Sequence, residues 1–410
     1  MSRRTGSADL PLHGGRVPAW LSTRMAALGA VIAQAIVHHY GRDELLRRLA
    51  HPFWFQAFGS VMGMDWHSSG ITTSVLGALK RGLAPLEEEL GIYVCGGRGR
   101  HSRRTPDELA RVGERTGLDG DALAQSSRLV AKVDSAAVQD GYELYLHGFI
   151  VSREGRWCVV QQGMSGERRE ARRYHWLSEH VRSFVDDPHA AIEGPRRGAI
   201  VNLADARAAR NRRAALALVH EGPQRAIDTL RRWQPVGNAA LDLFDPPPAA
   251  ASAPMPHLTM PAHHDVRAGD VDLRRLHATL AAAADRGPAD FETLLLVPGV
   301  GARTVRSLAF VAEVLHGAPA RFADPARFSL AHGGKDGHPF PVPLKIYDET
   351  IRVLRGAVDR ARLGNDDRLA AIRRLDEEAR RLDGLANGPT LEAYVAEEWS
   401  SAAANGGRSV

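Results

Sequence analysis

The chain has 410 residues, a length that favours two or three domains. Hydrophobic residues make up 44% and charged residues 25%, which is an ordinary globular composition. We find no apolar run long enough to span a bilayer, and two cysteines, Cys95 and Cys158, exclude a disulfide framework or a cysteine-rich zinc site. We therefore expect a cytoplasmic protein with no membrane partner. The net charge of +5 is compatible with a polyanionic partner.

The first part of the chain, residues 1–235, predicts a mixed α/β domain that carries the candidate catalytic site. Apolar residues recur with helical spacing over residues 20–40 and 204–233. Alternating apolar, β-branched and aromatic residues predict strands elsewhere in this part of the chain. The strand-like runs cover residues 91–95, 142–151 and 157–162.

The composition changes after this domain. Residues 236–269 are rich in proline and alanine, a composition that cannot pack regularly and predicts a linker. Helical periodicity then returns, so residues 270–395 predict an all-α domain. Residues 396–410 predict a disordered tail.

Two polar motifs lie in the first hundred or so residues. Asp65 and His67 are two residues apart, so a loop that turns back brings two potential ligands together. Residues 96–102 form a loop rich in glycine and arginine directly after a predicted strand, which favours a backbone nest for an anion. A solvated turn is the alternative, and the loop lacks the Gly-Lys-Ser/Thr of a P-loop.

Two acidic residues follow in a pattern typical of metal sites. Lys132 and Asp134 lie near the end of a predicted helix, and Asp140 enters a predicted strand. This layout is similar to that of metal-dependent nucleases, in which carboxylates hold a metal ion. We therefore predict that Asp134 and Asp140 bind Mg²⁺ or Mn²⁺, and that Lys132 stabilises the charge that develops on a phosphate.

A predicted hairpin supplies two more candidate residues. A two-residue turn at Glu154-Gly155 puts His147 opposite Gln162 on one face of the two strands. The nucleases carry Glu-x-Lys where this chain has Gln161-Gln162, so an exposed polar sheet face is the alternative interpretation. The predicted catalytic residues are Asp65, His67, Lys132, Asp134, Asp140, His147 and Gln162.

Further cations occur beside aromatic or glycine residues. Residues 172–176 mix cations with rings, as grooves for single-stranded nucleic acid do, so Arg172 and Arg173 are candidate contacts. A basic strand flanked by core aromatics fits this pattern equally well. Lys335 lies in a glycine loop at residues 332–337 and is a candidate phosphate contact, with an Asx-type turn as the alternative.

The clearest motif is a predicted helix-hairpin-helix at residues 291–316. Gly299 and Gly301 allow a tight turn between two helices, and Pro298 lies where no backbone donor is needed. The second helix then offers free N–H groups and the positive end of its dipole to a phosphate oxygen. The predicted contacts are Gly299, Val300, Gly301, Arg303, Thr304 and Arg306. Such contacts read the backbone and not the bases, whereas a plain αα-corner with a glycine turn is the alternative.

Six motifs together resemble those of a bacterial and archaeal family catalogued as domain-of-unknown-function family 763. They lie at residues 10–15, 65–73, 132–135, 161–164, 172–176 and 331–337. The resemblance runs from about residue 6 to about residue 360 and is broken by the linker. It departs from the expected pattern at Arg98, where we expect lysine, and it implies no mechanism.

These observations lead to one hypothesis with two alternatives. We predict a DNA-binding protein of DNA repair or processing, namely a metal-dependent nuclease whose C-terminal helices hold DNA without sequence choice. The alternatives are a non-catalytic nucleic-acid-binding module and an enzyme acting on a small phosphorylated ligand. Salt-sensitive binding to DNA of arbitrary sequence would argue against the enzyme that acts on a small phosphorylated ligand. Cleavage of DNA with Mg²⁺ or Mn²⁺ would distinguish the nuclease from the non-catalytic binding module.

Overall fold

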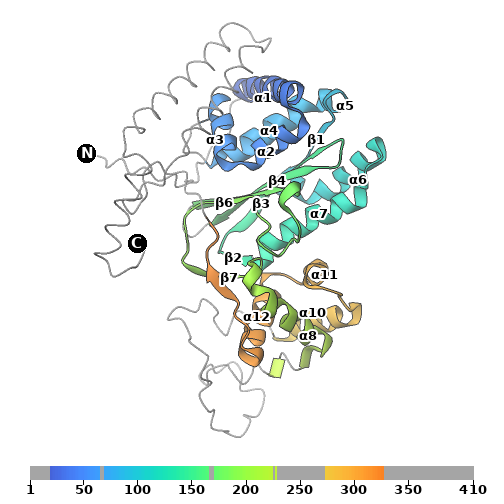
Figure 1. Cartoon of the computed structure of the whole chain (residues 1–410), viewed down its shortest axis with the longest axis vertical. Helices are drawn as coiled ribbons and strands as arrows, with labels where there is room; N and C mark the ends of the chain where they lie inside the picture. The colour runs from blue at the N-terminus through green and yellow to red at the C-terminus, as the bar shows by residue number, and fades with distance from the viewer. Residues whose placement is uncertain (1–18, 65–68, 166–169, 225–226, 229–272, 327–410) are drawn as a thin grey trace, which may run out of the picture.

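The computed structural model describes residues 19–64, 69–165, 170–224, 227–228 and 273–326 (Figure 1). The predicted linker and tail lie outside these ranges, as does most of the predicted all-α domain. Three predicted site residues, Asp65, His67 and Lys335, also lie outside the described residues.

The centre of the fold is a five-stranded antiparallel sheet with the strand order β1-β3-β4-β5-β6. Its strands are β1 (Ile92–Arg98), β3 (Glu143–Ser152), β4 (Trp157–Ser165), β5 (Glu170–Leu177) and β6 (Ala191–Glu193). Consecutive residues of β4 and β5 are buried, which means that both faces of these strands are covered. The strands are rich in valine, isoleucine and aromatic residues, which pack well on such a surface.

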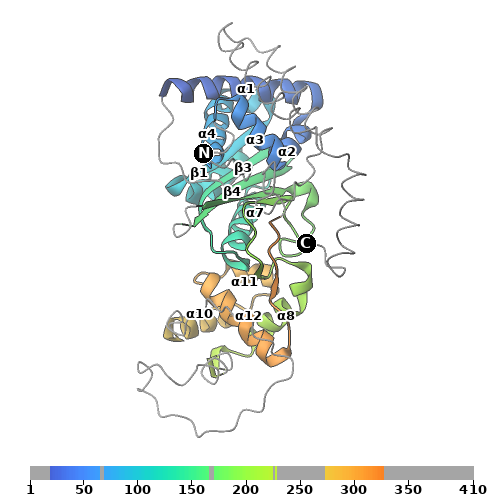
Figure 2. The same ribbon diagram turned by 90° about the vertical axis from the view of Figure 1, so that its left-hand side faces the viewer.

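Helices from the first part of the chain cover one face of the sheet (Figures 1 and 2). They are α1 (Ala19–Tyr40), α2 (Arg42–Ala50), α3 (Pro52–Val61) and α4 (Gly70–Leu83), followed by η1 (Ala84–Leu86) and α5 (Glu87–Leu90). Side chains of these helices, such as Ile32, Phe58 and Leu79, share one buried cluster with Ile150 and Val160 of the sheet.

A second helical layer covers the opposite face. In this layer, α6 (Thr105–Thr116) and α7 (Gly120–Lys132) contact the sheet; η2 (Gly99–Arg104) precedes them and a π-helical turn, η3 (Val133–Ala137), follows them. The remaining helices form a group beyond α7, in which α11 contacts α7 and α12 contacts η3 (Figure 1). They are α8 (Ala209–His220), α10 (Leu273–Arg286), α11 (Phe291–Leu296) and α12 (Ala302–His316). The chain signals their ends locally: Asp119 caps α7 by accepting the N–H of Ala122, and Gly117 ends α6 with φ at +79°. The sheet therefore lies between two helical layers.

A small second sheet joins residues near the end of the described chain to the first predicted domain. Its order is β2-β7-β8, formed by β2 (Val138–Gln139), β7 (Ala199–Asn202) and β8 (Arg321–Ala323). Leu294 and Leu308 belong to the same buried cluster as Val130 and Trp176. The described part of the predicted C-terminal domain, residues 273–326, thus packs on the first domain and shares its core.

Several predicted elements are confirmed, and one register is corrected. The helix predicted at residues 20–40 is α1, and the predicted strand pair is β3 and β4. The turn between these strands has three residues and not two, because Gly155 adopts φ of +80° and Ser152 bonds Arg156. This turn places His147 opposite Gln161 and not opposite Gln162, and a separate irregularity follows between Leu146 and Leu144. Because side chains alternate between faces, Gln162 lies on the other side of the sheet from His147.

The prediction that no apolar run reaches membrane-spanning length also needs correction. One stretch of α1, Leu21–Tyr40, is long and apolar enough to cross a membrane by length and composition. A core helix passes the same test, and Met25, Ile32 and Ile36 of this helix are buried inside the fold. This helix is therefore weak support for a membrane span.

Candidate functional site

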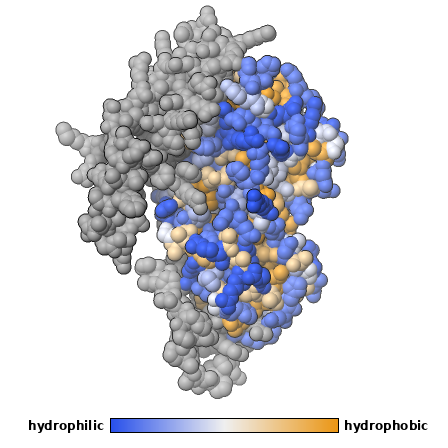
Figure 3. Space-filling view, in the orientation of Figure 1, coloured by the Kyte–Doolittle hydropathy of each residue, from blue (hydrophilic) through white to orange (hydrophobic). Residues whose placement is uncertain are grey.

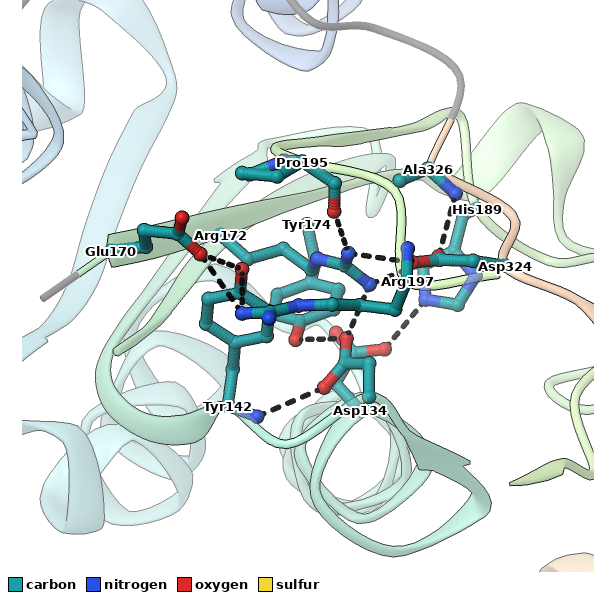
Figure 4. A network of polar contacts seen from close by, with 11 residues as sticks. Asp134, Tyr142, Glu170, Arg172, Tyr174, His189, Pro195, Arg197, Asp324 and Ala326 are labelled. Carbon is teal, nitrogen blue, oxygen red and sulfur yellow. Dashed lines mark hydrogen bonds and ion pairs between the residues drawn. The ribbon is translucent and has the colours of Figure 1, made fainter. Parts of the chain in front are cut away.

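A buried hydrogen-bond network that includes Asp134 lies between α7 and the sheet. Figure 4 shows two of its members, Asp134 and His189. The carboxylate of Asp134 accepts hydrogen bonds from Gln161 Nε2 at 2.5 Å and Trp176 Nε1 at 2.9 Å. His189 Nε2 lies 2.5 Å from its other oxygen. Asp134 is fully buried, whereas the His189 side chain is 10% exposed, so this end of the hydrogen-bond network lies close to the surface.

The same hydrogen-bond network continues to Ser127 and determines which ring nitrogen of His147 carries the proton. His147 Nδ1 lies 2.6 Å from Gln161 Oε1, an amide oxygen that only accepts, so Nδ1 carries the proton. His147 Nε2 then accepts from the Ser127 hydroxyl at 2.9 Å. Burial lowers the pKa of His147, which keeps the ring neutral as this arrangement requires. Ser127 is buried and offers no nucleophile to a substrate, so the chain ties α7 to the sheet.

Asp140 belongs to a second buried cluster on the same face. Its carboxylate accepts from Arg172 Nη1 at 2.9 Å, the Tyr174 hydroxyl at 2.7 Å and the Tyr142 N–H at 3.1 Å. Burial raises the pKa of Asp140, although the nearby Arg172 guanidinium opposes this effect. Arg172 also pairs with Asp324 at 2.7 Å, 152 positions later in the chain, so one cation connects distant segments.

Two arginines lie over the same aromatic ring in this cluster (Figure 4). The guanidinium carbons of Arg172 and Arg197 are 4.7 and 4.8 Å from the centre of the Tyr142 ring. Arg197 also pairs with Glu170 at 2.9 Å, and its backbone N–H bonds Asp324. These contacts satisfy the charges within the protein, so Arg172 acts in the fold as a buried structural cation.

The predicted metal pair gains no support from this geometry. Asp134 and Asp140 are buried, and each carboxylate is already occupied by its own set of protein donors. A hard cation binds carboxylate oxygens that are free to coordinate it, and here Arg172 and the Trp176 indole occupy them. Within the described ranges, no group of three or more His, Cys, Asp or Glu side chains is arranged to hold a metal ion. Binding of Mg²⁺ or Mn²⁺ stays a prediction.

Gln162 and Arg173 lie on the opposite face of the sheet, against α3 and α4. Arg173 donates to Thr72 Oγ1 and Gln56 Oε1, both at 2.8 Å, and its Nη1 lies 3.1 Å from Glu193. Burial raises the pKa of Glu193 to about 7, and Arg173 moderates that rise. Arg172 and Arg173 are both fully buried on opposite faces of β5, so residues 172–176 form a core strand and not the surface groove that we expected.

Among the predicted sites that the structure describes, the turn between α11 and α12 is the most open. The Val300 N–H bonds the Val297 carbonyl at 3.0 Å, and Gly299 has φ of +89°, which fits a type II turn with Pro298 in its second position. Pro298 and Gly299 are exposed, as is Arg303 on the first turn of α12. The Val300 and Thr304 side chains are buried and fix the turn to the core.

The start of α12 leaves backbone donors uncapped. The first α-helical bond joins the Val305 N–H to the Gly301 carbonyl, so the preceding N–H groups have no intrahelical acceptor. Gly301 occupies the N-cap position, and no side chain caps the helix. The N–H groups of Gly301, Ala302, Arg303 and Thr304 can therefore accept an anion as their partner.

Lys132 lies at the base of this turn. Its ammonium donates to the Val300 carbonyl at 2.5 Å, which joins a predicted catalytic residue to the predicted hairpin. Burial lowers the pKa of Lys132, and within the described ranges no carboxylate is paired with it. Gln139 steadies the same region by donating to the Ala302 carbonyl and accepting from Arg306. The turn is thus held by polar contacts from beneath, and its outer side is open.

The glycine-rich segment at the end of β1 differs from both interpretations of the sequence. Gly96 adopts φ of +90°, and its N–H donates to Glu108 Oε2 at 2.7 Å. Lys80 bridges the same carboxylate at 2.6 Å and the Gly96 carbonyl at 2.8 Å. A carboxylate of the protein therefore occupies the position that we predicted for an external anion.

Comparison with known proteins identifies the family. A family model described as a protein of unknown function, DUF763, matches residues 6–342 of the chain. The chain belongs to the DUF763 family. This match confirms the family resemblance of the sequence motifs. For this DUF763 protein, neither the curated proteins nor the solved structures gave a match.

Sequence reasoning missed three residues that organise the buried site of this DUF763 protein. Gln161 takes the place expected for Gln162, and a three-residue turn would have shown this by shifting the register by one. His189 and Asp324 contact Asp134 and Arg172 from distant parts of the chain. No local pattern marks either of these two contacts.

Proposed function

We propose that this protein binds the sugar-phosphate backbone of DNA, without sequence choice, through the turn between α11 and α12. The observation that carries the proposal is the partly exposed, uncapped start of α12. Beside it lies the ammonium of Lys132, which donates to the Val300 carbonyl and has no carboxylate partner among the described residues. Free helix N–H groups, the positive helix end and a nearby cation together favour a phosphate oxygen. The exposed Arg303 adds a second cation on the same helical turn.

Rigidity of the turn supports this proposal. Val300 and Val305 are fully buried, and α11 begins with a reciprocal capping box between Asp290 and Thr293. The N–H groups are therefore held in place before a ligand arrives. A preorganised site avoids part of the ordering entropy that binding otherwise costs.

A nuclease activity finds less support than DNA binding. The carboxylates of Asp134 and Asp140 are buried, and a substrate phosphate has no direct route to them in this structure. The non-catalytic binding module is thus the simpler interpretation. Incubation of labelled duplex and single-stranded DNA with Mg²⁺ or Mn²⁺ tests the difference, and metal-dependent loss of the label would restore the nuclease.

A charge placed in the turn tests the DNA contact. In Gly299→Asp, we expect binding to a labelled duplex of arbitrary sequence to fall by about tenfold or more, because the carboxylate repels a phosphate. Fluorescence anisotropy at several salt concentrations measures the affinity and its salt dependence. For the unchanged protein, the logarithm of the binding constant should fall linearly with the logarithm of salt concentration.

Gly117→Asp is the matched control for this substitution. Gly117 is also exposed with positive φ, at +79°, and a Cβ there meets open space. Both variants therefore add the same charge and a similar backbone strain at different surfaces. Equal binding by the two variants would contradict the proposed contact, as would an unchanged protein that binds no DNA.

A further inference from the structure

The loop that follows β1 carries an unusual concentration of positive charge. Residues 98–104 contain four arginines and one histidine and no acidic residue. Arg98, Arg100, Arg103 and Arg104 are all exposed, as is His101. Within the described ranges, none of these four guanidinium groups is paired with a carboxylate. We call residues 98–104 the arginine loop.

The arginine loop is held rigidly from beneath. The ion pair of Lys80 and Glu108 holds Gly96, two residues before the loop. The Ser102 hydroxyl donates to the Gly99 carbonyl at 2.6 Å, and the buried Thr105 hydroxyl donates to the Ser102 carbonyl at 2.7 Å. The carboxylate of Glu108 thus binds Lys80 and the Gly96 N–H, and it does not pair with the arginines of the loop.

The spacing of the arginines places two of them on the same side of the loop. Residues 99–104 form a 3₁₀ helix, in which side chains three positions apart lie on the same side. Arg100 and Arg103 therefore share one side. At the start of the loop, the Arg98 guanidinium lies over the Tyr145 ring, 5.8 Å from its centre, which limits its freedom. The backbone of the loop and the Arg98 side chain are therefore held in place, and Arg100 and Arg103 extend from the same side of this braced backbone.

The chemistry around the loop favours a polyphosphate backbone as its partner. A membrane anchor or a protein interface generally needs exposed apolar side chains beside the charges. Among the described residues, the large hydrophobic side chains that are exposed are Tyr40 and Leu315, and neither belongs to this loop. Figure 3 likewise shows mainly hydrophilic residues, with small apolar groups between them, on the face that it draws. Charge alone suffices for contacts with nucleic-acid phosphates.

We infer that the arginine loop is a second DNA-contact surface, which binds phosphates independently of sequence. This inference rests on the proposed function of the α11–α12 turn and extends it. Each arginine that contacts a phosphate releases counterions, so the loop adds to the salt dependence of binding. The contact is preorganised because the protein itself braces the loop.

A charge-matched pair of double variants tests this inference in the full chain. In Arg100→Ser/Arg103→Ser, we expect weaker binding to duplexes of any sequence and a slope of log binding constant against log salt that is smaller by about one to two units. Arg182→Ser/Arg213→Ser is the control, since both of its arginines are also exposed. Circular dichroism and thermal unfolding check that both variants fold.

The outcomes separate the two proposals. If the unchanged protein binds no DNA, the proposed function itself fails. If Gly299→Asp weakens binding but the two double variants have equal slopes, the α11–α12 turn stands and the arginine loop is overturned. Vesicles containing anionic phosphatidylserine form the last arm. Loss of vesicle binding in Arg100→Ser/Arg103→Ser, with unchanged DNA binding, would assign the loop to membranes and overturn the inference.

Discussion

Glu193 is a buried acid whose protonation is linked to folding. It is 1% exposed, its two oxygens lack an aligned hydrogen-bond donor, and Arg173 is the cation beside it. Burial raises its pKa from 4.5 to about 7 in the folded protein. A raised pKa means that the folded state holds the proton more tightly than the unfolded state does. The stabilisation is therefore full below pH 4.5 and is lost as the pH rises through about 7.

Glu193→Gln should remove this pH dependence. We expect the free energy of unfolding of the unchanged protein, relative to the variant, to fall between pH 4.5 and 8 by roughly 3 kcal/mol, at about 1.4 kcal/mol per unit of pKa shift. Urea unfolding across that range measures the difference, and other titrating groups cancel because both proteins contain them. Parallel stability curves for the two proteins would show that Glu193 does not titrate in this window.

Asp134 stabilises the fold as the shared acceptor of three buried hydrogen bonds, whether or not it binds a metal. In Asp134→Ala, the donors of Gln161, Trp176 and His189 lose their shared acceptor inside the protein. We expect a loss of roughly 3 kcal/mol or more in the free energy of unfolding, because buried donors are left unpaired. Urea unfolding of this variant beside Asp134→Asn, which keeps one acceptor oxygen, measures the loss. An alanine variant as stable as the unchanged protein would instead point to a carboxylate kept for chemistry.

The elements themselves could largely be predicted from the sequence. The helix at residues 20–40 and the strands near residues 142–162 follow from local periodicity, which one stretch of chain contains in full. The turn of this strand pair shows the limit of such reasoning. Whether Arg153 joins Glu154 and Gly155 in the loop depends on backbone angles, and one residue moves Gln162 to the other face.

The candidate site could be predicted only in part. Lys132, Asp134 and His147 do lie in polar clusters, but their burial depends on packing between distant segments. Arg172 illustrates the reason: its partner Asp324 follows β8, some 150 residues later, and no local signal announces the pair. The pattern of polar residues on β5 therefore predicted a surface groove, although helical layers cover both faces of that strand.

At the scale of the whole molecule, the α11–α12 turn is integrated into the main fold. Residues 273–326 share the core cluster that contains α7 and the sheet, and β8 pairs with β7. Lys132 and Gln139, from the first predicted domain, hold the turn that belongs to the second. The turn is therefore connected to the central sheet through α7 and η3.

The backbone amides at the start of α12 provide the most direct test of the central claim. Their resonances can be followed by transverse-relaxation-optimised NMR while a short duplex is titrated into the labelled protein. We expect the N–H signals of Gly301, Ala302 and Arg303 to shift most among the described residues of α11 and α12, and the shifts to saturate with the binding curve. Saturated binding that leaves these three signals unmoved would contradict it.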